Sequence, residues 1–367
     1  MKKVFIIGSK GPYSIGGYET FVRNVGDELC KLNYDVYVTS ESSPAKDSEF
    51  DFSFKPVHMF NEEKEISPMQ RILYDLYAAY LTVKCNADIV YMCGYNAAWV
   101  LFLPLVFGKK IYINSDGIEW KRPSWGKNVI KRGYLIFNEF LLKVFPINVI
   151  SDSKEVASYF NEKYNLASTF IAYGGDSFPP INKELEGPTL QKYSLEPGNY
   201  YFISVRIVED NFVDKLINAF STLKSSKLVI IGKIPDTKYG EFVKSILHEN
   251  VKIIDLTSLS LEYNIIRKNA KANIHSHRFG GTSPNLLEVM CLNIPVISFD
   301  TPYAREVLLE NALYYSDPDS LIKRIYEFQE LSQESISSMV KNNRNRIDEF
   351  YNWKIIARQC DELFKLK

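Results

Sequence analysis

Residues 272–306 contain the sequence feature that most constrains the fold: an apolar strand, a glycine pair, a helix and a second apolar strand in direct succession. The first strand ends before Gly280 and Gly281, and Pro284 then occupies a position where proline commonly begins a helix. Pro295 opens the second apolar run. Strands joined through a helix are expected to lie parallel in one sheet, so this stretch predicts an α/β unit.

The same alternation of strands and helices occupies the rest of the chain. The continuous apolar run at residues 4–8 is typical of a parallel strand covered by helices on both faces, and Ser67 followed by Pro68 marks a later helix start. The alternation begins again at residue 200, which predicts an α/β fold of two Rossmann-like domains. The expected division is an N-terminal domain at 1–176, a proline-containing linker at 177–199, a C-terminal domain at 200–350 and a terminal helix at 351–367.

Composition and charge narrow the class of protein. The 367 residues hold 44 Lys and Arg against 44 Asp and Glu, and this balance does not indicate a nucleic-acid partner. The five cysteines lack metal-ligand spacing and are expected to be reduced thiols. The N-terminal apolar run is too short for a signal peptide, and the run at 97–108 is too short to span a bilayer. We therefore expect a cytoplasmic protein.

Several familiar enzyme motifs do not match. The glycines after the first strand do not have the G-x-G-x-x-G spacing of nicotinamide enzymes, and no Walker phosphate-loop motif is present. His275, His277 and Asp300 suggest a metal site, but His-x-His on a strand offers no clear third ligand. We therefore expect neither a bound metal nor a cofactor.

The glycine pair and the helix after it can form an anion site. Backbone N–H groups at a helix N-terminus are unpaired, and the helix dipole favours negative charge there. Thr282 and Ser283 add hydroxyl donors beside Gly280 and Gly281. We interpret this stretch as the binding place of a nucleotide diphosphate. The alternative is an ordinary tight turn with Glu288 as a solvated helix residue.

Three motifs indicate a family: GGYETF at 16–21, DGIEWKR at 116–122 and HSHRFGGTSPNLLEVM at 275–290. With them the chain resembles the family-4 retaining glycosyltransferases of the GT-B fold, and within these the bacterial capsule and polysaccharide rhamnosyltransferases. The resemblance implies two facing Rossmann-like domains, with a C-terminal helix that crosses back to the N-terminal domain. It also implies a nucleotide-sugar donor held mostly by the C-terminal domain, net retention and no essential metal ion.

The resemblance assigns donor-binding and catalytic roles in the C-terminal domain. Arg206 matches the family's phosphate-binding arginine, and the alternative is a surface ion pair with Glu209 or Asp210. A metal-free transferase must neutralise its departing diphosphate with cations and amide dipoles. Glu288 matches the second of two family glutamates and is expected on the ribose hydroxyls.

Two positions depart from the family pattern. Gly280 stands where the first glutamate is expected, and Phe212 stands where a lysine is expected. Lys215 lies one helical turn further along and could replace that lysine. These departures fit a donor with a deoxy sugar, because such a sugar offers a different pattern of hydroxyls.

The N-terminal domain is expected to supply the acceptor site. Gly16 and Gly17 would let their loop approach the donor phosphates or the acceptor, with Glu19 opening the helix that follows. Asp116 follows the strand at 110–114, at the sheet edge where ligands bind, and is expected to orient the acceptor or handle its proton. Glu119 lies in the same motif. A turn-capping role for Asp116 is the alternative.

Residues 121–143 mix basic and aromatic side chains, a pattern that could rest on anionic lipid or form an ordinary amphipathic helix. The family resemblance alone implies transfer of L-rhamnose from dTDP-L-rhamnose to a lipid-linked glycan, and with this basic, aromatic segment we expect the protein at the inner face of the membrane. The alternatives are a UDP-hexose-dependent glycosyltransferase, a nucleotide-sugar epimerase on the same fold and a catalytically silent glycan-binding protein.

Overall fold

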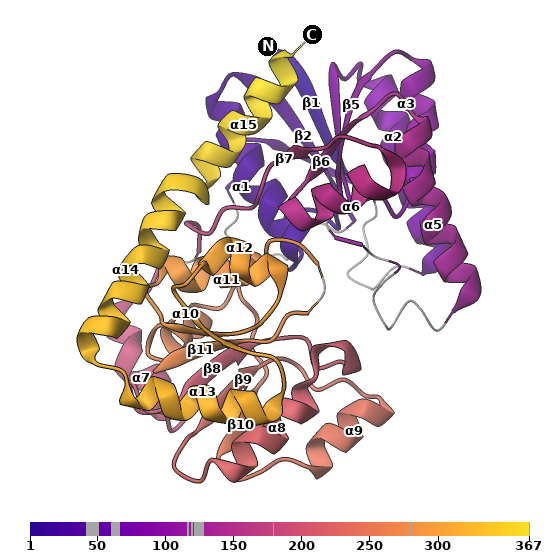
Figure 1. Ribbon diagram of the computed structural model, residues 1–367. Coiled ribbons are helices and arrows are strands. Elements are labelled where there is room, and N and C mark those ends of the chain that lie inside the picture. Colours follow the sequence, from indigo (N-terminus) through magenta and orange to yellow (C-terminus); the bar gives the residue numbers. More distant parts are fainter. Residues whose placement is uncertain are drawn as a thin grey trace. The chain divides into compact units, whose positions relative to one another are not determined.

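A computed structural model describes residues 1–41, 51–59, 67–115, 117–118, 120, 128–178, 180–278 and 280–366. The chain forms two compact α/β units, whose elements are labelled in Figure 1. The first unit comprises Met1–Tyr173, Phe279–Thr282 and Trp353–Lys367, and the second comprises Gly174–Arg278 and Ser283–Asn352.

The described part of the first unit contains a seven-stranded parallel sheet in the order β3-β2-β1-β4-β5-β6-β7. The strands are β1 Lys2–Ile7, β2 Tyr34–Ser40, β3 Lys55–His58, β4 Ile89–Cys93, β5 Lys110–Ser115, β6 Asn148–Ser151 and β7 Thr169–Phe170. Because β1 pairs with both β2 and β4, the strand order reverses at β1. The residues 4–7 of β1 are fully buried, as the continuous apolar run predicts.

Helices pack on this sheet. They are α1 Gly17–Lys31, α2 Pro68–Lys84, α3 Phe102–Val106, α5 Val129–Val144, α6 Lys154–Tyr164 and α15 Trp353–Lys365, with a short 3-10 turn η1 Ala98–Leu101. The predicted start of α2 is confirmed: Ser67 and Gln70 form a capping box, and Pro68 is the first helical residue.

The terminal helix α15 belongs to the first unit and packs along α1 (Figure 1). The hydroxyl of Tyr34 donates to Asp361 Oδ1 at 2.8 Å, and that of Tyr112 donates to the carbonyl of Leu363 at 3.0 Å. Phe364 lies among aromatic rings, with its centroid 4.7 Å from that of Tyr112. The predicted return of the C-terminal helix to the N-terminal sheet is therefore present.

The described part of the second unit contains a six-stranded parallel sheet in the order β10-β9-β8-β11-β12-β13. The strands are β8 Tyr201–Ser204, β9 Leu228–Ile231, β10 Val251–Ile254, β11 Ala272–His275, β12 Val296–Phe299 and β13 Leu313–Tyr315. β8 pairs with both β9 and β11, so the strand order reverses between them. In open α/β sheets, ligands bind outside the carboxyl ends of the strands at such a point.

Ten helical segments of the second unit are described. They are η3 Lys183–Leu185, α7 Glu186–Lys192, η4 Glu209–Asn211, α8 Val213–Thr222, α9 Lys238–Ser245, α10 Leu261–Lys268, α11 Pro284–Cys291, α12 Pro302–Leu308, α13 Pro318–Glu330 and α14 Gln333–Phe350. One apolar cluster includes α8 and α13, and a second includes α7 and α10.

The expected linker at 177–199 needs correction, because it is not a structureless connection. It contains η3 and α7, and Leu190 and Leu195 are buried in the apolar cluster with Tyr263. The prolines that suggested a linker mislead here. Pro188 falls in the first turn of α7, where a helix needs no backbone donor.

His275 ends β11 as a buried residue, 5% exposed, with its ring stacked on that of His277. Burial, together with the neighbouring His277, lowers the pKa of His275 to about 3. An unfolded histidine has a pKa of about 6.5. Between these values the unfolded chain binds a proton that the folded chain excludes, so acidification destabilises the fold.

We predict that His275→Gln flattens the acid dependence of the stability of the second unit. The wild type should lose at most about 1.4 kcal/mol of unfolding free energy per pH unit below pH 6.5 through this residue. Urea unfolding at several pH values between 7.5 and 5 measures the slope. The control is His58→Gln, a histidine substitution at an exposed position of the first unit that is measured in the same way. Equal slopes for His275→Gln and the wild type would contradict the prediction.

Candidate functional site

The loop between β11 and α11 has the predicted form. Pro284 is the first residue of α11, and Ser283 occupies its N-cap with an extended backbone. Gly280 has φ 122°, a conformation that favours glycine. At Gly281, a Cβ atom would lie 1.9 Å from Asp152 Oδ1. Both glycines are therefore required by the local structure of the chain.

Thr282 is buried, and both of its predicted donors have protein acceptors in this structure. Its amide donates to Asp152 Oδ2 at 2.9 Å, and its hydroxyl donates to the Asp152 carbonyl. Residues 279–282 group with the first unit, whereas Ser283 begins the second. The amide of Thr282 thus binds an anionic oxygen here, but that oxygen belongs to a carboxylate of the chain.

Glu288 lies on α11 and is held by a buried arginine. Its Oε2 atom is 2.6 Å from an Nη atom of Arg267, whose side chain is fully buried. The Glu288 side chain is only 15% exposed, so Glu288 is not a solvated helix residue. Its Oε1 atom has no hydrogen-bond partner among the described residues, which leaves it able to accept a bond from a hydroxyl group.

Arg267 was not among the residues identified from the sequence. It lies on α10, donates to Asn264 Oδ1 at 2.7 Å and to Asn285 Oδ1 at 3.3 Å, and stacks on Tyr263. Asn285 also accepts from the Tyr263 hydroxyl at 3.0 Å. This cluster joins α10 to the first turns of α11. The available sequence signal was a charged residue on the buried stripe of α10, four residues after Tyr263.

Arg206 is exposed two residues beyond β8, and its carbonyl accepts a 2.7 Å bond from Asn211. Its guanidinium makes no ion pair within the part of the chain that the structure describes. Lys215 lies on α8, 3.5 Å from Asp214, and lines a small hollow with Phe212 and other residues of the second unit. Both cations that were predicted to bind the donor are thus solvent-accessible in the second unit.

In the first unit, Gly16 is the N-cap of α1 and Gly17 its first residue. Glu19 is 7% exposed and accepts a 2.9 Å bond from the amide of Lys10. A Cβ atom on Gly16 would lie 2.0 Å from Glu19 Oε2. The glycine therefore makes room for a carboxylate that fixes the preceding loop. Asp116 and Glu119 lie outside the described residues.

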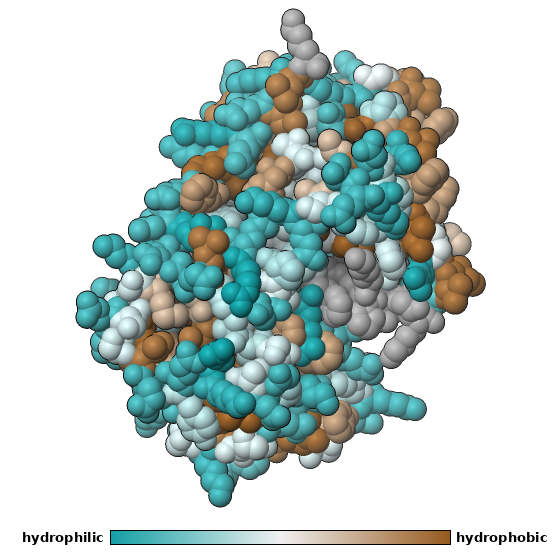
Figure 2. All heavy atoms as spheres, viewed as in Figure 1, coloured by the Kyte–Doolittle hydropathy of each residue, from teal (hydrophilic) through white to brown (hydrophobic). Residues whose placement is uncertain are grey.

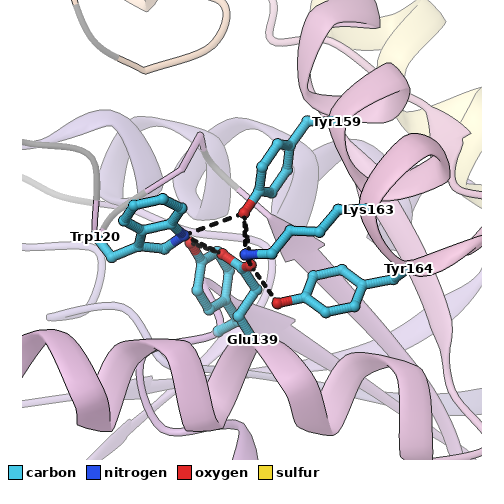
Figure 3. A network of polar contacts seen from close by, with 6 residues as sticks. Trp120, Glu139, Tyr159, Lys163 and Tyr164 are labelled. Atoms are coloured by element: carbon cyan, nitrogen blue, oxygen red, sulfur yellow. Dashed lines mark hydrogen bonds and ion pairs between the residues drawn. The ribbon is translucent and has the colours of Figure 1, made fainter.

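A buried carboxylate organises the side chains around Trp120 (Figure 3). Glu139, on α5, is fully buried. Its Oε1 atom accepts from the hydroxyls of Tyr159 and Tyr164, both at 2.7 Å, and from Lys163 at 2.8 Å. Its Oε2 atom accepts from Trp120 at 2.9 Å and from Tyr95 at 3.3 Å. Five donors thus surround one carboxylate.

Electrostatics reinforce this cluster. Burial, together with the Glu139 carboxylate, raises the pKa values of Tyr159 and Tyr164, so both phenols stay protonated and donate. The Lys163 ammonium lies 4.8 Å from the Trp120 ring centroid, and Arg132 also stacks on that ring. Trp120 belongs to the DGIEWKR motif, so its hydrogen bond to Glu139 holds one residue of that motif in place. Sequence reasoning missed Glu139 because its donors come from separate elements.

Comparison with known proteins supports a class for this site. Residues 1–176 match the family model "Domain of unknown function (DUF1972)", and residues 190–346 match the model "Glycosyl transferases group 1". A curated relative, the uncharacterized glycosyltransferase MJ1069 of Methanocaldococcus jannaschii, is 23% identical over 400 residues. That alignment covers 100% of this chain and 99% of the relative.

Solved structures share the fold. Sucrose-phosphate synthase from Thermosynechococcus elongatus superposes with a TM-score of 0.81 at 16% identity, over 100% of this chain and 98% of that one. Anabaena Alr3699/HepE, solved in complex with UDP and glucose, has a TM-score of 0.77 at 14% identity over the full length of both chains. The expected GT-B fold is confirmed, and the family matches support a glycosyltransferase of the group 1 kind.

Two features are absent from the described residues. No helix among them is long and apolar enough to cross a membrane. Within the same residues, no group of three His, Cys, Asp or Glu side chains is placed to hold a metal ion.

We predict that Glu139→Gln lowers the unfolding free energy of the first unit by about 3 kcal/mol. The substitution leaves Lys163 without its carboxylate and directs an amide N–H at groups that are themselves donors. Urea unfolding measures the loss. The neighbouring Glu162 is exposed on α6, and Glu162→Gln should change stability by less than about 0.5 kcal/mol. Equal stability of the two variants would mean that the network contributes little.

Proposed function

We propose that this protein is a retaining glycosyltransferase that uses a nucleotide-sugar donor. The sugar carbon C1 exchanges its bond to the diphosphate oxygen for a bond to an acceptor hydroxyl. A nucleoside diphosphate and one proton are released. The observation that carries the proposal is Glu288, held by Arg267 beside the N-terminus of α11, within a sequence segment that matches group 1 glycosyltransferases.

Each donor-site residue receives a role in this proposal. Glu288 accepts a hydrogen bond through its unpaired oxygen from the 3′-hydroxyl of the nucleotide's sugar ring, which is present both in the deoxyribose of dTDP and in the ribose of UDP. The N-terminus of α11 at Ser283, with Thr282 and the glycines 280 and 281 before it, receives the diphosphate. For Thr282 to take part, its amide must exchange Asp152 for a phosphate oxygen.

Cationic side chains complete the donor site. Arg206 acts as a catalytic residue because it neutralises charge that develops on the departing diphosphate. Lys215 adds a second positive charge from α8. Together with the backbone amides, these cations allow a reaction that needs no metal ion. Gly16 and Gly17 are assigned to donor binding through the resemblance of the GGYETF motif.

On the acceptor side, Asp116 orients the acceptor hydroxyl and manages its proton, with Glu119 in the same motif. Glu19 contributes through the loop that its carboxylate fixes. The Glu139 cluster supports the motif from its other end by anchoring Trp120.

The leading donor is dTDP-L-rhamnose, and a UDP-hexose is the second candidate. The rhamnosyl assignment rests on the resemblance of the sequence motifs and on the two departures at Gly280 and Phe212. The UDP-hexose alternative is supported by Anabaena Alr3699/HepE, whose structures hold UDP, UDP with glucose, or UDP-glucose.

An apolar face on the first unit supports a lipid-linked acceptor at a membrane surface. Large apolar side chains are exposed along α2, α3 and α5, and brown spheres gather over these helices in Figure 2. They are Met69, Ile72, Leu73, Leu76, Tyr77, Tyr80, Phe102, Val106, Phe107, Val129, Ile130, Tyr134, Phe137, Phe140 and Val144. Helix α2 adjoins α3, and η1 adjoins both α2 and α5, so the elements that carry these side chains are neighbours in the first unit.

The charges on this face suit an anionic lipid surface. Lys84 on α2 and Lys131, Arg132 and Lys143 on α5 are exposed, whereas the Glu139 carboxylate of α5 is buried. Apolar side chains can enter the headgroup region while the basic groups contact lipid phosphates. We therefore propose peripheral binding at the inner face of the cytoplasmic membrane.

A vesicle assay tests the membrane proposal. The double variant Ile130→Ser/Phe137→Ser should lose most co-sedimentation with phosphatidylcholine vesicles that contain phosphatidylglycerol, and added salt should weaken wild-type binding. Phe242→Ser, at an exposed position of α9 in the second unit, is the matched control and should bind like the wild type. Identical binding of both variants would remove α5 from the membrane contact.

A donor screen tests the function itself. Thermal shifts with UDP, GDP, dTDP and their sugars identify the nucleotide, and transfer to an acceptor is then measured with that donor. We predict that Arg206→Ala lowers kcat by about 10²–10³-fold without changing stability, because it removes charge stabilisation of the departing diphosphate. The exposed Arg358 supplies a control, Arg358→Ala, with wild-type turnover expected.

The screen also separates the other functional classes. Conversion of the donor sugar without any acceptor would identify an epimerase. Binding of the nucleotide sugar with no turnover, for a range of glycan acceptors, would indicate a silent binding protein.

A further inference from the structure

A small hollow lies inside the second unit at the carboxyl ends of three strands. Lys215 and Phe212 border it after β8, Ser276 and Arg278 border it after β11, and Tyr315 closes it at the end of β13. Leu216, Asp317, Pro318 and Leu321 complete its lining. The carboxyl ends of parallel strands are where open α/β sheets bind their ligands, so the hollow has the right location for a binding site.

Arg278 is held in the hollow by aromatic rings instead of by a carboxylate. Its guanidinium carbon lies 3.7 Å from the ring centroid of Phe212 and 4.0 Å from that of Phe299. Its Nε atom is buried and has no hydrogen-bond partner among the described residues. A guanidinium stacked in this way keeps its planar set of donors oriented and available for an oxyanion.

Ser276 provides a second unused donor. Its side chain is 4% exposed, and its hydroxyl oxygen is buried without a hydrogen-bond partner in the described structure. Buried hydroxyl groups normally have a partner, so an unpaired one that lines a hollow indicates a position for a ligand atom. Arg278 and Ser276 are two residues apart in the segment that follows β11.

The acidic side chains near the hollow are already engaged. Asp317 caps α13, where Oδ1 accepts from the amide of Ser320 at 2.8 Å and Oδ2 accepts from the hydroxyl of Ser316 at 2.9 Å. Asp214 accepts from the hydroxyl of Tyr239 at 3.0 Å and lies 3.5 Å from the Lys215 ammonium. These two carboxylates are therefore occupied by other partners, whereas Arg278 Nε and the Ser276 hydroxyl are buried in the described structure without one.

We propose that Arg278 and Ser276 bind a phosphate group of the nucleotide-sugar donor, with Arg278 taking oxygen atoms of the diphosphate. The inference rests on the proposed function. It places the phosphate group at Arg278, two residues before Gly280. A guanidinium can bind two oxygens of a phosphate group at once. A carbonyl or a neutral sugar hydroxyl of a ligand does not offer such a pair of anionic oxygens. When the C1–O bond breaks, its electron pair moves onto the diphosphate, and Arg278 stabilises that added negative charge.

The test measures binding separately from transfer. Arg278→Met keeps an apolar stem between the two rings and removes the charge, whereas Arg278→Lys keeps a charge without the planar donors. Isothermal titration is performed with UDP, GDP, dTDP, each matching nucleoside, and inorganic pyrophosphate. Arg305→Met is the matched control, because Arg305 also stacks on a ring, that of Tyr314, but lies outside the hollow lining.

For the nucleotide that the wild type prefers, we expect Arg278→Met to weaken diphosphate and pyrophosphate binding about 10- to 100-fold. Nucleoside binding should stay unchanged, Arg278→Lys should fall between wild type and Arg278→Met, and Ser276→Ala should show a smaller loss. Arg305→Met should bind like the wild type.

Two results would overturn the assignment while leaving the proposed function intact. One is an Arg278→Met protein that transfers sugar and binds the diphosphate as the wild type does. The other is an equal loss of nucleoside and diphosphate binding, which would show that Arg278 only supports the fold. A wild-type protein that binds neither pyrophosphate nor any of the nucleotides would overturn the proposed function together with this inference.

Discussion

The burial of charged side chains is the constraint on which the described sites depend. A buried ion is tolerated only when other groups replace its water shell, so each one fixes several neighbours. Glu139 gathers five donors in the first unit, and Arg267 gathers Glu288, Asn264 and Asn285 in the second. Each cluster therefore determines where a nearby segment lies: Trp120 in one case and the first turns of α11 in the other.

These clusters are better explained by orientation than by stability. Replacing a satisfied buried ion pair with apolar side chains is often neutral for folding. What such a replacement would remove is the fixed direction of Glu288, one oxygen of which is bonded to Arg267 while the other is available. A carboxylate that is already oriented needs no reorganisation when a ligand binds, and this is the usual source of strong electrostatic binding in active sites.

The sequence predicts the parallel sheets and the start of α11 well, because local patterns determine them. Apolar runs mark β1, and Pro284 marks a helix that begins where expected. Side-chain partners were not predictable in the same way. Arg267 and Glu288 are 21 residues apart on separate helices, so their pairing depends on how α10 and α11 pack. Composition also misled once, since proline in the first turn of α7 resembled a linker signal.

Phe212 shows how one residue can replace another in a different chemical role. It has a positive φ of 54° at the start of α8, and its ring supports the guanidinium of Arg278. A lysine at this position would present its own charge on a flexible stem. The aromatic ring instead holds a planar cation that comes from the end of β11, at the cost of a strained backbone conformation. The hollow thus keeps a positive charge, but the charge comes from Arg278 after β11 instead of from a lysine at the start of α8. The departure at residue 212 is therefore consistent with an anion site and does not argue for its loss.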